Sequence, residues 1–440
     1  MEVVIASSLG DGGISAWELS TGSEQLPRHK DCSSPPHGLA SVGGRFLASS
    51  QSRDPSATSG SVFYWSWEKP QVEVKCFPAE PIGPLIANPE GTFIVGGGVS
   101  GEIYLWEVPT GKLLRKWNAH YRVVTCLVFS DDGSLLISGS EDGSVRVWSL
   151  YMIFDDLRRQ EAKHLYVHNF TGHNLRVTDV ICGYGGSNSI IISASEDRTC
   201  KVWSLSKGIL LRSVLFPSVI NAISLDPGEL VFYAGSRDGK IYIAALNAES
   251  NSKSTYGMHI IGSLSDYSKA VTCLTHSMDG NLLVSGSEDG LVKVWDVRSG
   301  AIVRMLRHSK GPVNNVLITR KQVPSNPKSS RKHGSQLPPP LQKYENSGND
   351  DQEGKSLVRL SGTQPGRGSS YVMTAVMNRQ IEELQRQGSA ATEIESERLK
   401  SDQKTSMQMV NKWKQMFDDI HQFCIDEILD KGMADTTRTT

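Results

Sequence analysis

The sequence has few cysteines and none of the paired spacings that bind metal or build disulfide frameworks. Its seven cysteines are odd in number and scattered over 440 residues, with no C-x-x-C pair. Two of them, Cys126 and Cys273, alternate with apolar residues in VVTCLVF and AVTCLTH, as buried strand residues do. We therefore expect free thiols in a reducing compartment, no zinc site and no cofactor.

Long apolar runs and an excess of one charge are also missing. No stretch approaches the roughly 18 apolar residues of a membrane helix, and the N-terminal MEVVIASSLGDGG lacks the basic region of a signal peptide. The formal net charge of -1 argues against a surface that traps nucleic acid as a whole. These absences predict a soluble intracellular protein with no membrane partner.

One phrase is repeated along the chain. ISGSEDGSVRVWSL at 137–150 returns as ISASEDRTCKVWSL at 192–205 and as VSGSEDGLVKVWDV at 284–297. Its tryptophan aligns six units, anchored on Trp17, Trp65, Trp106, Trp148, Trp203 and Trp295. The last gap is twice a repeat length, and AGSRDGKIYIAAL (234–246) fills it, with Ala244 at the tryptophan position. The chain therefore has seven units with a period of about forty residues.

This period, with short alternating strands and Gly/Asp turns, is typical of WD-repeat propeller blades. We predict an all-β fold, a seven-bladed WD-repeat β-propeller over residues 1–320. The segment GPVNNVLITR (311–320) reads as a first strand without its blade, and the chain opens on strands that lack one. Pairing of both chain ends is expected to close the ring, which leaves no open sheet edge.

The repeat also carries polar residues that WD proteins join in a hydrogen-bonded chain. The predicted network residues are His120, Ser140, Asp142, Trp148, His173, Ser195, Asp197, Trp203, Asp289 and Trp295. A Ser/His/Asp catalytic triad is the alternative, but the set recurs in step with the repeat and has no nucleophile elbow. Tyr267 replaces the histidine of the last unit and Ser100 replaces an aspartate, so these two blades are expected to be held mainly by packing.

Two insertions interrupt the repeat. Residues 151–170 (YMIFDDLRRQEAKHLYVHNF) are predicted to form a short amphipathic helix on the rim, with Ile153 and Leu157 on its apolar side; a tolerated loop is the alternative. The segment QSRDPSATSG (51–60) is small and polar and is interpreted as a mobile hairpin.

Composition changes after residue 320. Residues 321–370 are rich in proline, serine and charge and are predicted to be a disordered linker. A basic cluster without acids spans the boundary between the propeller and this linker: Arg320, Lys321, Lys328, Arg331 and Lys332. A nuclear import signal is one interpretation, and an ordinary solvated cluster is the other.

Helical patterning returns over 371–432, a predicted assembly tail, before a disordered end at 433–440. An apolar stripe recurs every three to four residues: Val410, Trp413, Phe417, Ile420, Cys424 and Ile428. Such a stripe must be buried, and packing against a second copy or a partner is favoured over docking on the propeller's own flank. A two-stranded coiled coil, which would make a homodimer, is a hypothesis.

Three features together resemble one family, the WD-repeat subunit of the rixosome, a complex that acts on large-subunit ribosome precursors. They are the Gly-rich turn in RVTDVICGYGG (176–186), the segment SVLFPSVINAISLDP (213–227) before the blade without tryptophan, and the helical insertion followed by a helical tail. The resemblance implies a non-enzymatic scaffold in the nucleus, in both nucleolus and nucleoplasm. It also implies a helical-repeat partner, a giant AAA-type ATPase placed on the pre-large-subunit particle, and support for removal of the internal transcribed spacer.

Two other functions remain open from the sequence. VWDVR (294–298) fits the W-D-x-R pattern of substrate receptors in cullin-type ubiquitin ligases, at residues 295–298. An enzyme on a propeller would need acids or metal ligands converging on the central channel, and the pattern offers only turn aspartates.

Overall fold

The computed structural model describes ten stretches of the chain, and all of them belong to the first of its two compact units, Met1–Gly362. They are residues 2–9, 13–24, 28–29, 31–52, 59–67, 69–155, 164–246, 259–308, 311–320 and 337–344. The second unit, Thr363–Thr440, lies outside them, as do the predicted tail stripe and the disordered end.

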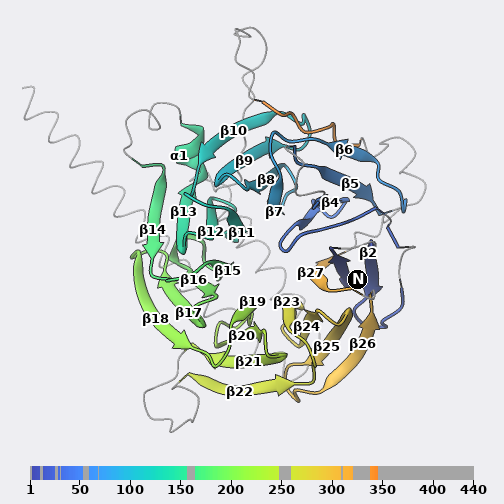
Figure 1. The fold of residues 1–440 in the computed structure, drawn as a ribbon, viewed down its shortest axis with the longest axis vertical. Helices are drawn as coiled ribbons and strands as arrows, with labels where there is room; N and C mark the ends of the chain where they lie inside the picture. Colours follow the sequence, from blue (N-terminus) through green and yellow to red (C-terminus); the bar gives the residue numbers. More distant parts are fainter. Residues whose placement is uncertain are drawn as a thin grey trace, which may run out of the picture. The chain divides into compact units, whose positions relative to one another are not determined.

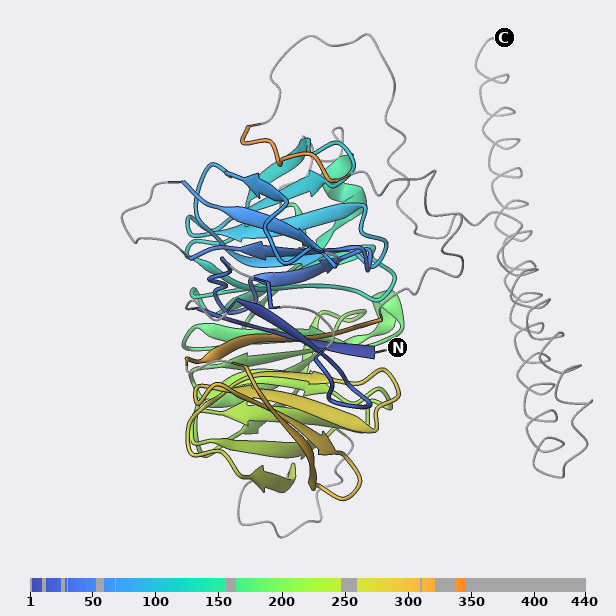
Figure 2. The same cartoon turned by 90° about the vertical axis from the view of Figure 1, so that its right-hand side faces the viewer.

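Seven antiparallel sheets stand around a central channel, as Figure 1 shows from above and Figure 2 from the side. Blade 1 consists of β27 (Val313–Arg320), β1 (Glu2–Ser8) and β2 (Ile14–Glu18). Blade 2 has β3 (Leu39–Val42), β4 (Phe46–Ser50), β5 (Val62–Ser66) and β6 (Val74–Cys76). Blade 3 has β7 (Ile82–Ala87), β8 (Phe93–Gly98), β9 (Glu102–Glu107) and β10 (Leu113–Asn118). Blade 4 has β11 (Val124–Phe129), β12 (Leu135–Ser140), β13 (Ser144–Ser149) and β14 (Tyr166–Thr171).

The remaining three blades repeat the four-stranded pattern. Blade 5 has β15 (Val177–Cys182), β16 (Ile190–Ser195), β17 (Thr199–Ser204) and β18 (Ile209–Leu215). Blade 6 has β19 (Ile220–Leu225), β20 (Val231–Ser236), β21 (Lys240–Ala245) and β22 (Ile260–Ser265). Blade 7 has β23 (Val271–His276), β24 (Leu282–Ser287), β25 (Leu291–Asp296) and β26 (Ile302–Arg307). The short helix α1 (Leu150–Phe154) follows β13, and a 3-10 turn, η1 (Gly186–Asn188), follows β15.

The two ends of the propeller sequence meet in blade 1. β27 pairs antiparallel with β1, with Glu2 opposite Arg320 and Ile5 opposite Leu317. The prediction of a seven-bladed ring closed by both chain ends is therefore confirmed. Closure matters physically because an unpaired innermost strand would expose a row of backbone donors and acceptors.

The core lies between neighbouring blades, because each sheet buries both of its faces. Between blades 4 and 5, for example, Val147 and Phe170 pack with Val177 and Trp203. The rings of Phe170 and Trp203 stack at a centroid distance of 4.7 Å. The residues on both faces of a strand are therefore apolar. For this reason small and large residues alternate along the sequence, and polar and apolar residues do not.

Polar side chains near the start of the innermost strands join blades 5, 6, 7 and 1 in series. The Thr178 hydroxyl of blade 5 donates to the carbonyl of Ile220 at 2.7 Å, and the Asn221 amide of blade 6 donates to the carbonyl of Val271 at 2.9 Å. The Thr272 hydroxyl of blade 7 continues the series to the carbonyl of Val313 in blade 1. The ring is thus held by hydrogen bonds at its inner edge as well as by apolar packing.

Blade 6 shows how the missing tryptophan is replaced. Ala244 stands opposite Phe232, the register in which Trp148 stands opposite Leu136 in blade 4. Phe216 fills the neighbouring space, at ring-centroid distances of 6.3 Å from Phe232 and 5.7 Å from Tyr242. The aromatic volume is therefore supplied by three smaller rings in place of one indole.

The insertion predicted at 151–170 is shorter in the structure. Helix α1 spans five residues and buries Leu150 and Ile153, whereas Tyr166–Thr171 is the outer strand of blade 4 and so belongs to the repeat. Residues 156–163, which include Leu157, lie outside the described part, as do residues 53–58 of the predicted hairpin.

One part of the predicted disordered linker is instead ordered on the propeller. Residues 337–344 (LPPPLQKY) lie against the outer edge of the ring, between the labels of β6 and β10 in Figure 1. Leu341 is 5% exposed and belongs to the core cluster of blades 2 and 3. The linker prediction is therefore wrong for these eight residues, because a proline-rich segment can dock without forming regular secondary structure. Residues 321–336 and 345–370 are outside the described residues.

Candidate functional site

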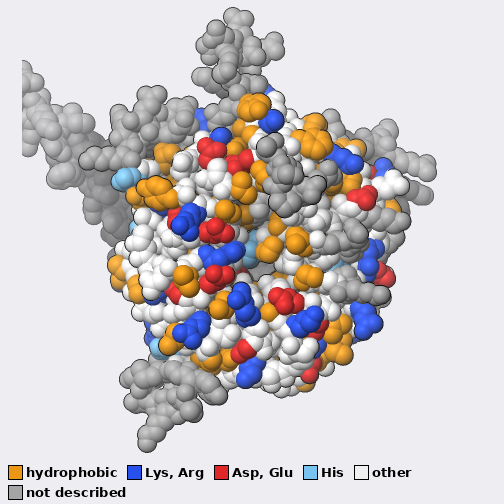
Figure 3. All heavy atoms as spheres, in the orientation of Figure 1, with side chains coloured by type: hydrophobic (Ala, Val, Ile, Leu, Met, Phe, Trp, Pro, Cys, Tyr) orange, Lys and Arg blue, Asp and Glu red, His pale blue; other side chains and the backbone are white. Residues whose placement is uncertain are grey.

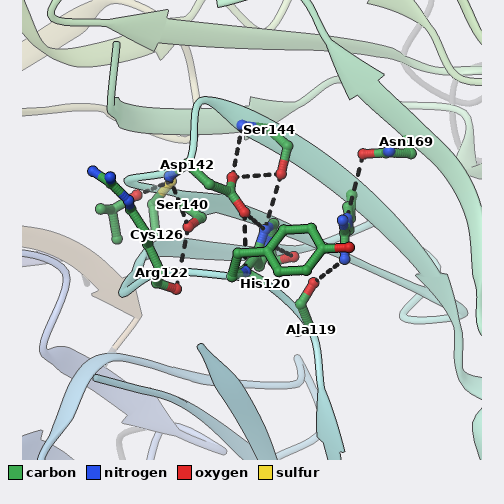
Figure 4. A network of polar contacts seen from close by, with 12 residues as sticks. Ala119, His120, Arg122, Cys126, Ser140, Asp142, Ser144 and Asn169 are labelled. Carbon is green, nitrogen blue, oxygen red and sulfur yellow. Dashed lines mark hydrogen bonds and ion pairs between the residues drawn. The ribbon is translucent and has the colours of Figure 1, made fainter. Parts of the chain in front are cut away.

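The polar network of blade 4 joins β12, β13, the turn between them and the loop before the blade (Figure 4). The Trp148 indole N–H donates to the Ser138 hydroxyl at 2.8 Å, and that hydroxyl lies 2.7 Å from His120 Nε2. On the other side of the ring, His120 Nδ1 lies 3.3 Å from the Asp142 carboxylate. The Ser144 hydroxyl also donates to Asp142, at 2.5 Å. The chain thus runs from the buried indole to the turn between β12 and β13.

The charges in this network are fixed by burial and hydrogen bonding. Burial lowers the pKa of His120, so the imidazole is neutral at neutral pH. Burial alone would raise the pKa of Asp142, but hydrogen bonds from His120 and Ser144 outweigh it and hold that pKa below its usual range. With Asp142 ionised, Nδ1 carries the histidine proton, and Nε2 accepts from Ser138.

Blade 5 repeats the arrangement. The Trp203 indole N–H donates to Ser193 at 2.9 Å, and the Ser193 hydroxyl lies 2.8 Å from His173 Nε2. His173 Nδ1 lies 3.0 Å from the Asp197 carboxylate, which also accepts from the Thr199 hydroxyl at 2.6 Å. Burial lowers the pKa of His173 as it does that of His120.

The structure corrects the predicted serines of both networks. Ser140 donates to the carbonyl of Arg122 at 3.3 Å, and Ser195 donates to the carbonyl of Leu175 at 3.2 Å. Trp148 stands opposite Leu136 on the neighbouring strand, so Ser138 is two residues from that pair and Ser140 is four. At about 3.3 Å per residue, the indole reaches only the nearer serine. Ser140 and Ser195 instead tie their turns to the loop before each blade.

A catalytic role for the Ser138–His120–Asp142 set is excluded by access. Ser138 has no exposed surface, and His120 is 1% exposed. A nucleophile must reach a substrate carbon, and this hydroxyl is enclosed between an indole and an imidazole. The set therefore holds the blade together, as its recurrence in blade 5 indicates.

Blade 7 was expected to rely mainly on packing because it has no network histidine. Instead, the Tyr267 hydroxyl lies 2.7 Å from Ser285 Oγ, which accepts the Trp295 indole N–H at 2.7 Å. The Lys293 ammonium lies 3.9 Å from the centre of the Tyr267 ring. Asp289 accepts the backbone N–H of Leu291 within the turn. A phenol thus replaces the imidazole and keeps the indole hydrogen-bonded.

In blade 3, Glu80 takes over the function of the missing turn aspartate, which the sequence analysis did not identify. Its carboxylate accepts the Ser100 N–H at 2.9 Å and the Ser100 hydroxyl at 2.7 Å. It also accepts the Tyr104 hydroxyl at 2.8 Å. A Cβ on Gly60 would meet the Glu80 carbonyl as one on Gly101 would meet the His120 carbonyl, so Glu80 stands in the place of the network histidine, and that place in the repeat was the only available signal.

A polar cavity lies at one mouth of the central channel. A cavity of about 530 Å³ is lined there by basic and acidic residues, among them Arg176, Arg237, Lys269, Glu196 and Glu288. Arg176 lies 3.6 Å from Glu141 and 3.9 Å from Glu196, so cations and anions alternate around the opening. Figure 3 shows Lys/Arg and Asp/Glu side chains alternating beside the centre of the face in view. Such a rim suits a protein partner with both charge signs.

The segment before β3 covers part of this mouth. The His37 carbonyl accepts the N–H of Leu85 in blade 3, while His37 Nε2 lies 3.2 Å from the Thr178 carbonyl in blade 5. Asp179 stands 3.8 Å from the same imidazole and accepts the N–H of Ile223 at 2.8 Å. Burial raises the pKa of Asp179. One loop thus links non-adjacent blades across the channel.

The other predicted site residues lie at the edge of the described chain or beyond it. Arg320 ends β27, and its guanidinium lies 3.9 Å from the Glu2 carboxylate. The rest of the basic cluster and the six stripe residues of the tail are outside the described residues. Within the described stretches, no group of three or more His, Cys, Asp or Glu could hold a metal ion. In the same stretches, no helix is long and apolar enough to cross a membrane.

Comparisons with known proteins extend the structural result. The family model "WD domain, G-beta repeat" matches residues 111–149, 165–204 and 258–296. The chain is similar to Protein ROOT INITIATION DEFECTIVE 3 of Arabidopsis thaliana, with 55% identity over 97% of this chain and 98% of the relative. It is 36% identical to WD repeat-containing protein 18 of Homo sapiens, over 69% of this chain and 68% of the relative. Pre-rRNA-processing protein IPI3 of Yarrowia lipolytica is 29% identical, over 65% of this chain and 71% of the relative.

Proposed function

Because the chain belongs to the family of WD-repeat subunits of the rixosome, we propose that it is a non-enzymatic scaffold subunit of a nuclear complex for large ribosomal subunit maturation. The observation that carries this proposal is the similarity to relatives named for pre-rRNA processing. The fold supports both parts of the proposal. A closed ring with buried polar networks offers rigid loops for binding a partner. The network serine Ser138 has no exposed surface, so its hydroxyl is not accessible to a substrate.

The specific partners are part of the proposal. The propeller would bind a helical-repeat scaffold protein, and the assembly would place a giant AAA-type ATPase on the pre-large-subunit particle. Its location would be the nucleolus and nucleoplasm, with Arg320, Lys321, Lys328, Arg331 and Lys332 as the import signal. The charged channel mouth supports a protein contact on that face.

The tail is proposed to self-associate or to bind a partner through Val410, Trp413, Phe417, Ile420, Cys424 and Ile428. Deleting residues 405–432 should convert a homodimer to a monomer in light scattering or abolish partner binding in a pull-down. Normal assembly of the truncated protein would refute this assignment.

The function is tested by depleting the protein and probing precursor rRNA with a probe against the internal transcribed spacer. Spacer-containing precursors should accumulate, and the full chain should restore their removal. Arg176→Glu combined with Arg237→Glu should restore it poorly if the channel mouth binds a partner. Lys207→Glu, an exposed charge in the turn between β17 and β18, is the matched control. Unchanged precursor levels after depletion would refute the proposed function.

The ubiquitin-ligase alternative is not favoured. No relative compared above is named for ubiquitin transfer, and the W-D pair at 295–296 has local structural contacts. Trp295 donates to Ser285, and Asp296 accepts the hydroxyl of Ser299 at 2.6 Å within its turn.

A further inference from the structure

The segment 337–344, which we call the strap, occupies a groove on the flank of blades 2 and 3. Three hydrogen bonds hold it, and each uses its main chain. The Trp106 indole N–H donates to the Gln342 carbonyl at 2.9 Å, and the Gln342 N–H donates to the Gly111 carbonyl at 2.8 Å. The Leu341 N–H donates to the Cys76 sulfur at 3.2 Å.

Two side chains of the strap are buried, and their spacing is three residues. Pro338 and Leu341 face the groove, whereas Leu337, Pro340 and Lys343 are exposed. Residues three apart share one face of a polyproline II helix, and prolines favour that conformation. Leu341 packs with Tyr104, Trp106 and other residues of the blade 2 and 3 core. Aromatic-lined grooves that read a proline-rich segment are a known mode of peptide recognition.

Blade 3 has lost the groups that would otherwise hold its tryptophan. Gly96 stands where Ser138 stands in blade 4, so no hydroxyl is available to the Trp106 indole. A Cβ at residue 96 would lie 3.1 Å from the Trp106 ring, so the indole rests directly on this glycine. Its N–H points instead to the strap.

The groove is also shaped for close approach by the strap. A Cβ on Gly111 would lie 2.5 Å from the carbonyl oxygen of Pro340, and Gly111 has φ +68°. Glycine is therefore required here both by the backbone and by the bound segment.

We propose that this flank groove is a binding site for proline-rich P-x-x-L peptides and that residues 337–344 are its resident, releasable ligand in the same chain. The strap can be released without breaking a sheet, because it pairs with no described strand and its two end residues, Leu337 and Tyr344, are exposed. The site recognises main-chain groups through Trp106, Gly111 and Cys76, and it selects the sequence through the pocket for Leu341. This inference stands apart from the proposed function.

The test uses the full chain and a fluorescent peptide of sequence SQLPPPLQKYEN, which covers residues 335–346. Hydrogen exchange should show protected N–H groups at Leu341 and Gln342 in the natural protein. Leu341→Asp should raise their exchange rate at least 100-fold, since it places a charge in an apolar pocket. This variant should bind the peptide at least tenfold more tightly than the natural protein, whose groove is occupied.

Groove variants provide the controls. Gly111→Ala should release the strap and also block the peptide. Gly133→Ala is the matched control, since its φ is +66° but a Cβ there meets nothing within 4 Å. A peptide with aspartate in place of its second leucine should not bind.

The proposal is overturned if Leu341→Asp frees the strap but binds no peptide, or if the natural protein binds the peptide equally well. Strap-dependent dimerisation in light scattering, lost in both Leu341→Asp and Gly111→Ala, would assign the groove to a second copy and overturn the intramolecular assignment. Unprotected N–H groups at Leu341 and Gln342 in the natural protein would overturn it as well.

Discussion

The two serines at the end of β12 allow a direct test of the network geometry. In Ser138→Ala, the Trp148 N–H loses its acceptor and His120 Nε2 loses its donor, and both groups are buried. Each buried polar group left unsatisfied costs about 1–3 kcal/mol. We therefore expect the free energy of unfolding to fall by about 3 kcal/mol.

Ser140→Ala removes a weaker set of contacts. The lost bonds are 3.3 Å to the Arg122 carbonyl and 3.2 Å from the Asp142 N–H, both at the partly exposed turn. Water can reach these groups, so the expected loss is about 1 kcal/mol. The two variants differ only in which hydroxyl of one strand is removed, so each is the control for the other.

Urea unfolding of the full chain, followed by tryptophan fluorescence and circular dichroism, measures both losses. Midpoints are compared directly only if the slopes agree, since a changed slope signals an altered denatured state or a departure from two-state unfolding. Ser193→Ala and Ser195→Ala in blade 5 should repeat the contrast. An equal or larger loss from Ser140→Ala would refute the assignment of Ser138 as the central hydroxyl.

Three further predictions follow from buried groups. Burial lowers the pKa of His276 and of His308 to about 4. Between about pH 6.5 and pH 4 the unfolded chain therefore binds more protons than the folded chain. The free energy of unfolding should fall as the pH is lowered through this range, by up to about 3 kcal/mol for each histidine. Urea midpoints across this range should show the fall, and a flat profile would contradict it. Glu80→Gln should lower stability by about 1–2 kcal/mol, because an amide has one acceptor oxygen for contacts that a carboxylate shares between two; an unchanged melting temperature would contradict this. Ala244→Trp should cost about 1–3 kcal/mol by overpacking the aromatic cluster around Phe232, and a stabilised variant would show that the space is empty.

The ring could be predicted from the sequence because it depends on features that recur. The tryptophan marks the same strand in six units. The unpartnered strand at 311–320 had one open sheet edge to pair with, that of the N-terminal strand. The choice between Ser138 and Ser140 could not be made, because both lie on one face of one strand. Only the cross-strand register, with Trp148 opposite Leu136, decides which hydroxyl the indole reaches.

The strap was missed for a different reason. LPPPLQKY has the composition of a linker, and its order depends on a groove more than 200 residues earlier in the chain. The signal in that groove, Gly96 in place of a serine, reads as a simple loss in the sequence. It gains meaning only when the Trp106 indole is seen to bond the strap.

The blades that depart from the repeat show what the polar network does. Blade 3 satisfies its indole through the strap, and blade 7 through Ser285 and Tyr267. Blade 6 has no indole at this position and fills the space with Phe216. Blades 3, 6 and 7 thus share a packed aromatic group, and the indoles of blades 3 and 7 keep an acceptor for their N–H, whereas the buried Trp65 N–H of blade 2 has no hydrogen-bond partner among the described residues. Histidine and aspartate are one way to position that acceptor, so a blade that loses them can form a groove for an added segment without losing its fold.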